Sequence, residues 1–173
     1  MLRRVEPLID GGAIARRVAE IGREVTREAA GRPLLVVGVL TGAAVFVADL
    51  IRSIEGPVAV DFVAVSSYGD SECSSGKIRL LKDLTASVRG QRVLLVEDIV
   101  DTGQTVHALL ELLSARSPES LDVCALLDKP ARRIVEVPVR YRGFEVEDRF
   151  VVGYGLDASG LYRNLPHIGV LEP

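Results

Sequence analysis

The sequence predicts an α/β fold, a parallel β-sheet flanked by helices, and two observations lead to this prediction. Short apolar runs rich in Val occur at residues 34–40, 93–96 and 121–127, and each has the length and composition of a buried parallel strand. Between them lie segments whose apolar residues recur at helical spacing. Strands that alternate with helices in this way form parallel sheets, which bind ligands at the carboxyl ends of their strands.

The composition is that of a folded globular protein with a single domain over residues 1–173. Of its residues 48% are hydrophobic and 26% are charged, and the net charge of −3 argues against a nucleic-acid-binding surface. Cys73 and Cys124 lack the spacing of metal ligands and form no disulfide framework. Neither a signal peptide nor an apolar run as long as a membrane span is visible, so we expect a cytoplasmic protein without a membrane or nucleic-acid partner.

The first elements along the chain follow from this periodicity. A helix is predicted over residues 13–29, and Gly31 and Pro33 end it. The strand over 34–40 leads into a tight turn of small residues, 41–43, and a second helix begins after it. We therefore expect the turn at the carboxyl end of that strand to face a ligand.

The remaining elements alternate in the same manner. A strand over 58–66 precedes a polar stretch that reads as a mobile loop, and a returning strand follows at 77–81. Beyond the strand 93–96 a helix is predicted over 103–115. After the strand 121–127, further strand candidates are residues 144–152 and 168–171.

Acidic residues follow the buried strand 93–96 directly. Glu97 and Asp98 place two charges next to a core, which is costly unless a partner binds them. Their side chains point to opposite faces if the strand continues. Asp101 and Thr102 come next, and one interpretation is that they only cap the following helix. The other is that the turn and the helix N-terminus bind a phosphate while the acids bind hydroxyl groups or a metal ion. A P-loop and a G-x-G-x-x-G turn are both absent from the sequence.

The segment 93–105 resembles the phosphoribosyl pyrophosphate-binding segment of the type I phosphoribosyltransferases. Further segments, in order and at that family's spacing, resemble its hypoxanthine-guanine members; they are residues 40–43, 60–62, 67–69, 126–129, 143–145, 148–157 and 162–167. The resemblance implies a core of about residues 32–130. It also implies a small hood built from about residues 1–12 and 130–173, and a mobile flap loop.

For the sugar phosphate, the resemblance implies that Glu97 and Asp98 bind the ribose hydroxyls, since carboxylates only accept hydrogen bonds. The 5′-phosphate site would be the amides and hydroxyls of the loop Asp101, Thr102, Gly103, Gln104 and Thr105. Asp101 would also act as the catalytic general base or acid beside purine N7.

For pyrophosphate and metal, the resemblance implies a site formed by Leu40, Thr41, Gly42 and Arg163. The peptide between the first two of these residues would be cis, as in the family. Many relatives have Lys or Arg where this chain has Thr41, so contact there would depend on backbone amides. Mg²⁺ would be held by Glu97, Asp98 and Asp157.

For the purine base, the resemblance implies contacts from Lys129, Phe150, Val151 and Asp157, and a flap that begins at Ser67 and Tyr68. Without the resemblance, Lys129 reads as a solvated loop residue, and Phe150 and Val151 read as core strand residues. The flap likewise reads as an ordinary hairpin loop.

The function implied is purine salvage, in which a 5-phosphoribosyl group passes from phosphoribosyl pyrophosphate to hypoxanthine or guanine. The expected state is a homodimer or tetramer, as is usual in the family. Transfer to xanthine, adenine or a pyrimidine is an alternative, although the ammonium group of Lys129 favours a 6-oxo group because it can only donate. A non-catalytic RNA-binding regulator on the same fold is a second alternative, and it needs a basic face.

Overall fold

A six-stranded sheet forms the centre of the protein in a computed structural model that describes residues 4–67 and 78–172. The strand order is β4-β3-β2-β5-β6-β7, and all neighbours are parallel except β3 and β4. Their bounds are β2 Leu34–Leu40, β3 Val58–Ser67, β4 Ile78–Lys82, β5 Arg92–Val100, β6 Ser120–Asp128 and β7 Val139–Glu145. The mostly parallel α/β fold predicted from the sequence is confirmed.

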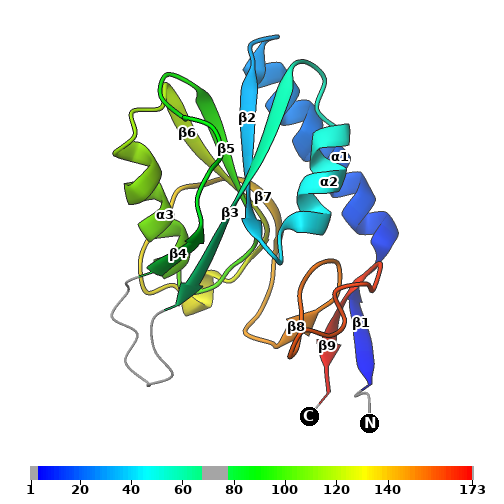
Figure 1. Ribbon diagram of the computed structural model, residues 1–173. Helices are drawn as coiled ribbons and strands as arrows, with labels where there is room; N and C mark the ends of the chain where they lie inside the picture. Colours follow the sequence, from blue (N-terminus) through cyan, green and yellow to red (C-terminus); the bar gives the residue numbers. More distant parts are fainter. Residues whose placement is uncertain (1–3, 68–77, 173) are drawn as a thin grey trace.

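Helices cover both faces of this sheet (Figure 1). The helices α1, Gly11–Ala29, and α2, Ala44–Arg52, pack on one face, and α3, Gln104–Ser114, packs on the other. Alternate residues of β5 supply the two cores: Leu94 and Val96 join the core under α1 and α2, while Val93 and Leu95 join the core under α3.

A second, three-stranded antiparallel sheet lies beside the first (Figure 1). Its order is β1-β9-β8, with bounds β1 Val5–Ile9, β8 Val151–Val152 and β9 Ile168–Leu171. Segments from the two ends of the sequence therefore form one small layer. The strand β7 lies within the residues expected in the hood but pairs with β6 in the large sheet. The division of the chain into core and hood at about residue 130 stays a prediction.

Several element bounds differ from the expectations. The first helix begins at Gly11 because the Asp10 carboxylate caps it, accepting a hydrogen bond from the Ala13 amide at 3.0 Å. The strand β5 continues past the two acids to Val100. A strand over 144–152 was wrong, because the charged residues 147–149 form a turn in which the Arg149 amide donates to the Glu147 carbonyl at 2.8 Å. The strand β1 was not foreseen, and a short 3₁₀ helix, Pro130–Arg132, follows β6.

Within residues 4–67 and 78–172, no helix is both long enough and apolar enough to cross a membrane.

Candidate active site

Glu97 and Asp98 lie next to each other on β5 but face opposite sides of the sheet. Glu97 continues the row of Val93 and Leu95 toward α3, and Asp98 continues the row of Leu94 and Val96 toward α2. The sequence alternation predicted this separation. One strand end therefore supplies one carboxylate to each of two neighbouring subsites.

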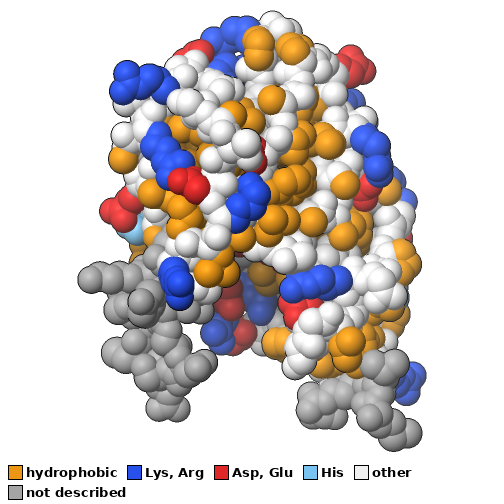
Figure 2. Space-filling model, in the orientation of Figure 1, with side chains coloured by type: hydrophobic (Ala, Val, Ile, Leu, Met, Phe, Trp, Pro, Cys, Tyr) orange, Lys and Arg blue, Asp and Glu red, His pale blue; other side chains and the backbone are white. Residues whose placement is uncertain are grey.

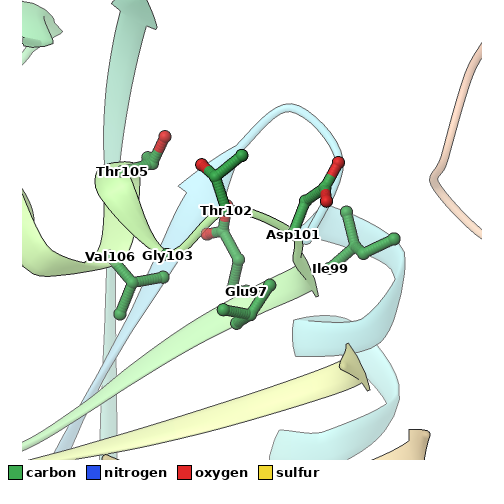
Figure 3. A pocket seen from close by; sticks show the side chains of 8 residues that line it. Glu97, Ile99, Asp101, Thr102, Gly103, Thr105 and Val106 are labelled. Carbon is green, nitrogen blue, oxygen red and sulfur yellow. The ribbon is translucent and has the colours of Figure 1, made fainter. Parts of the chain in front are cut away.

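The Glu97 subsite is a cavity of about 80 Å³ at the start of α3. Figure 3 shows the Glu97 side chain pointing toward the loop of residues 101–103, with Thr102 and Thr105 beside it. The carboxylate is buried, and its Oε2 atom accepts no hydrogen bond from the described part of the chain. Burial, and then the charge of Asp98, raises the pKa of Glu97 well above its ordinary value. A buried oxygen of this kind is available to a bound hydroxyl group.

The loop between β5 and α3 is shaped by Gly103, which has a φ of 85° and precedes the first helical residue. Because Gly103 occupies the N-cap position, no side chain is offered there to the first-turn amides. The Gln104 amide contacts the Thr102 hydroxyl at 3.4 Å, a long and weak bond. The Asp101 carboxylate accepts a hydrogen bond from Arg132 Nε at 2.9 Å. Of the two residues in the capping interpretation, Thr102 therefore contacts the start of the helix, and Asp101 pairs with an arginine instead.

The Asp98 subsite lies on the other side of β5, against the turn after β2. The peptide between Leu40 and Thr41 is cis, the conformation that the resemblance implied. A Cβ atom at Gly42 would collide with the Asp98 carboxylate, so the turn and the acid are in direct contact. Burial raises the pKa of Asp98 to about 6; the nearby charges of Arg163 and Asp157 act in opposite directions on it. Thr41 is exposed beside them.

Asp157 and Arg163 come from the loop that follows β8 and complete this subsite. Arg163 Nη2 lies 2.7 Å from Asp157 Oδ1, and Arg163 Nη1 donates to the Gly155 carbonyl at 2.5 Å. The Gly155 backbone packs so closely on the Gly42 carbonyl that a Cβ atom there would clash. The structure therefore brings together Gly42, Asp98 and the pair of Asp157 and Arg163.

The residues expected at the purine lie where the large and small sheets meet. Lys129 is buried, and its ammonium group donates to the Arg149 carbonyl at 2.8 Å. It is therefore not a solvated loop lysine. Phe150 has 60% of its surface exposed, which contradicts its reading as a core residue. Val151 is buried, so its side chain belongs to the core. It pairs with Val170 in β9, and its backbone lies on β8, the edge strand of the small sheet.

Of the two residues expected in the flap, Ser67 is the last residue of β3, and Tyr68 lies outside the described residues. Figure 2 shows acidic and basic side chains gathered in a hollow between the large and small sheets.

The sequence reasoning missed two arginines at this site. Arg132 connects Asp101 to Asp148, whose Oδ2 lies 3.3 Å from Arg132 Nη1. Arg133 connects the Asp101 carbonyl to the buried Asp128. Two adjacent arginines, one residue after Lys129-Pro130 at the carboxyl end of a buried strand, were the available signal.

Among residues 4–67 and 78–172, no three His, Cys, Asp or Glu side chains gather closely enough to enclose a metal ion. The donors present are Asp98 and Asp157, which face the same subsite. Mg²⁺ is usually bound by one or two carboxylates together with substrate phosphates and water, so this donor set fits a magnesium ion shared with a ligand.

Comparison with known proteins agrees with this arrangement. Residues 5–159 match the model of the phosphoribosyl transferase domain, and the chain belongs to the phosphoribosyltransferase family. Within the family it is 46% identical to the hypoxanthine phosphoribosyltransferase of Escherichia coli K12 over 98% of this chain and 96% of that one. A crystal structure of a hypoxanthine-guanine phosphoribosyltransferase from Bacillus anthracis has a TM-score of 0.93 and 41% identity, and covers 96% of this chain and 98% of that chain.

The bifunctional protein TilS/HprT of Listeria monocytogenes is 48% identical over 96% of this chain. This chain spans only 26% of the length of that relative. The resemblance to hypoxanthine-guanine phosphoribosyltransferases read from the sequence is confirmed.

Proposed function

We propose that this protein transfers the 5-phosphoribosyl group of phosphoribosyl pyrophosphate to hypoxanthine or guanine, yielding the nucleoside monophosphate and pyrophosphate. The observation that carries the proposal is the end of β5. There a buried carboxylate with an available oxygen opens into the same cavity as the Asp101–Thr105 loop, and a second carboxylate faces a separate subsite. Such a strand end fits a sugar that has a phosphate on one side and a charged leaving group on the other.

The sugar is oriented by the two acids under this proposal. Glu97 and Asp98 accept hydrogen bonds from the ribose hydroxyls, and the loop amides with the hydroxyls of Thr102 and Thr105 bind the 5′-phosphate. The position of the loop at the N-terminus of α3 supports this, because the positive end of the helix dipole favours a bound anion.

Departure of pyrophosphate leaves positive charge on the sugar, which the buried carboxylates stabilise. Arg163 and the backbone amides of the turn Leu40–Gly42 hold the leaving group. Because Thr41 has no charge, Arg163 provides most of the positive charge in this subsite. Asp98 and Asp157 would hold a magnesium ion, which would supply positive charge to neutralise the pyrophosphate. Glu97 faces the other subsite, so we assign it to the hydroxyls more than to the metal.

Asp101 takes or holds the proton at purine N7. In the structure its carboxylate is paired with Arg132, and it must exchange that partner for the base. The Lys129 ammonium group donates to the purine 6-oxo group in place of the Arg149 carbonyl, and the exposed Phe150 ring stacks on the base. Backbone groups at Val151 contact the edge of the base.

The rival proposal of an RNA-binding regulator has no support in the charge pattern. Each arginine between residues 132 and 163 lies within ion-pair distance of a carboxylate, so these side chains do not form a free basic face.

A homodimer or tetramer located in the cytoplasm belongs to the same proposal. Val60 and Leu81 on the outer strands β3 and β4 are 40% and 60% exposed, and Figure 2 shows apolar side chains gathered over β3. An exposed apolar face of this kind is typical of an assembly surface. Light scattering measures the assembly, and a strictly monomeric protein at micromolar concentration would refute it.

One assay tests the activity. The purified protein is mixed with phosphoribosyl pyrophosphate, with or without Mg²⁺, and with hypoxanthine, guanine, xanthine or adenine in turn. Nucleoside monophosphate should form from the 6-oxopurines and depend on the metal. Formation of product only from adenine, or from no base at all, would refute the proposal.

A further inference from the structure

The loop of residues 101–103 is anchored from the side that faces away from the ligand cavity. The amides of Ile134 and Val135 both donate to the Thr102 carbonyl, at 2.9 and 3.1 Å. Arg133 Nη1 donates to the Asp101 carbonyl at 2.6 Å. Two successive carbonyl groups of the loop are thus held by the segment 133–135.

Anchored carbonyls fix the direction of the loop amides. In a trans peptide the C=O and N–H groups point in opposite directions, because the unit is planar. The Asp101 carbonyl shares its peptide with the Thr102 amide, and the Thr102 carbonyl shares its peptide with the Gly103 amide. Holding both carbonyls toward 133–135 therefore turns both amides away from that segment. A 5′-phosphate needs preoriented N–H groups of this kind.

Arg133 also contacts a second element of the site. Its Nη2 atom pairs with Asp128, which is fully buried as the last residue of β6 and directly precedes Lys129. The guanidinium side chain is only 8% exposed. Asp128 is held in turn by Arg142 Nε at 2.7 Å, and the Lys129 amide donates to the Val100 carbonyl at 2.9 Å. The end of β6 is therefore a firm support for the arginine.

We infer that Arg133 is a positioning residue: it orients the Thr102 amide for the 5′-phosphate and holds that loop in register with the strand end that bears Lys129. The inference rests on the proposed function. Arginine suits the role because its planar fork donates to two acceptors in fixed directions. Lysine retains the charge for Asp128 but cannot hold both acceptors in that geometry.

The test compares Arg133→Lys with the matched control Arg140→Lys, whose guanidinium pairs with Asp122 and Glu28. Arg133→Lys is preferred to a neutral variant, because among the described residues a neutral variant would leave the buried Asp128 paired with Arg142 alone and could unfold the protein. Thermal melting identifies which variants are folded. Calorimetry then gives the affinity for inosine monophosphate, for ribose 5-phosphate and for inosine, which has no phosphate.

Arg133→Lys should weaken binding of both phosphorylated ligands about tenfold, the loss expected for one charged hydrogen bond, and leave inosine unchanged. The KM for phosphoribosyl pyrophosphate should rise by a similar factor, with kcat within about threefold. Arg140→Lys should change none of these values. Equal losses for inosine and its monophosphate, or no loss for either, would overturn the inference alone. If the wild-type protein binds neither phosphorylated ligand, the proposed function itself fails.

Discussion

The region proposed to bind the sugar phosphate and the region proposed to bind the purine are built differently. The first is one continuous stretch, from Glu97 to Thr105, in which Glu97 is buried and the loop is held by hydrogen bonds from residues 133–135. The second draws Lys129 from the end of β6, Phe150 from just before β8 and Val151 from its start, and the Phe150 ring is mostly exposed. The geometry of the continuous stretch is set by its own strand and loop. The geometry of the second region depends on how the large and small sheets pack against each other.

The largest effect should come from breaking the anchored loop with Gly103→Ala. A Cβ atom there clashes with the Val135 carbonyl, and a φ of 85° is unfavourable for alanine. We expect kcat/KM for phosphoribosyl pyrophosphate to fall about 100-fold, since small misplacements of binding groups have effects of that size. Steady-state kinetics measures it.

Gly90→Ala is the matched control, because its φ of 68° is also positive but a Cβ atom meets no neighbour within 4 Å. It should lose stability while retaining activity. Equal activity losses in the two variants would show that the loop geometry is not the cause.

Lys129→Met should affect the purine side with a smaller and more selective loss. The side chain is buried and its length is preserved, but the donor to a 6-oxo group is removed. We expect KM for hypoxanthine to rise about tenfold and KM for phosphoribosyl pyrophosphate to stay within about twofold. Lys82→Met removes an ammonium group that contacts Asp61 and serves as the control. An unchanged base preference would remove Lys129 from the base site.

Asp98→Asn should separate stability from activity. Because burial raises the pKa of Asp98 from 3.8 to about 6, the folded protein binds a proton there more tightly than the unfolded chain. The free energy of unfolding therefore decreases as the pH rises from about 4 to about 6, and the charge disfavours folding above that range. Asp98→Asn should flatten this slope and stabilise the protein by at most about 3 kcal/mol at pH 7.5, while transfer activity falls. The raised pKa of Glu97 should still make the free energy of unfolding depend on pH in this variant.

Denaturant unfolding between pH 4 and 7.5 measures this effect, and Asp83→Asn provides a control of opposite sign. A hydrogen bond from Arg116 lowers the pKa of Asp83, so that carboxylate stabilises the fold at neutral pH and loses its effect as the pH falls. A slope that Asp98→Asn leaves unchanged would contradict the burial argument.

The smallest effect should come from Arg116→Ala, far from both regions. Arg116 forms two hydrogen bonds with Asp83, at 2.7 and 2.8 Å, but both side chains are partly exposed. We expect a change of less than about 1 kcal/mol in the free energy of unfolding, with unchanged kinetics. Denaturant melts and the transfer assay check both values. A large activity loss here would mean that the site responds to any disturbance of the fold.

The sequence predicted the local structure around Glu97 and Asp98 well because the information for it lies in neighbouring residues. Apolar alternation in β5 placed Glu97 and Asp98 on opposite faces, and the small residues after them indicated the turn. Residue numbers for the strands 34–40 and 168–171 were also correct, since each is a run of apolar residues between clear breakers.

The purine side and its supports were harder to predict, because their contacts join distant segments. Nothing near Arg133 in the sequence indicates that its side chain reaches back to Asp101, and the pairing of β1 with β9 joins opposite ends of the chain. The candidate strand 144–152 failed because apolar residues at both of its ends hid a charged turn between them. Long-range pairing of this kind leaves no periodic trace in the sequence.

The close approach of Gly155 to the Gly42 carbonyl has a consequence for mutational scanning. Gly42 is already limited by Asp98, so two backbones and a carboxylate meet where no side chain can be inserted. Every other amino acid should fail at both positions, and a saturation library would rank Gly42 and Gly155 beside the proposed catalytic acids although neither glycine has a functional group. Intolerance to substitution at Gly42 and Gly155 therefore reports steric clashes. Only a separate assay of ligand binding can distinguish this cause from a catalytic role.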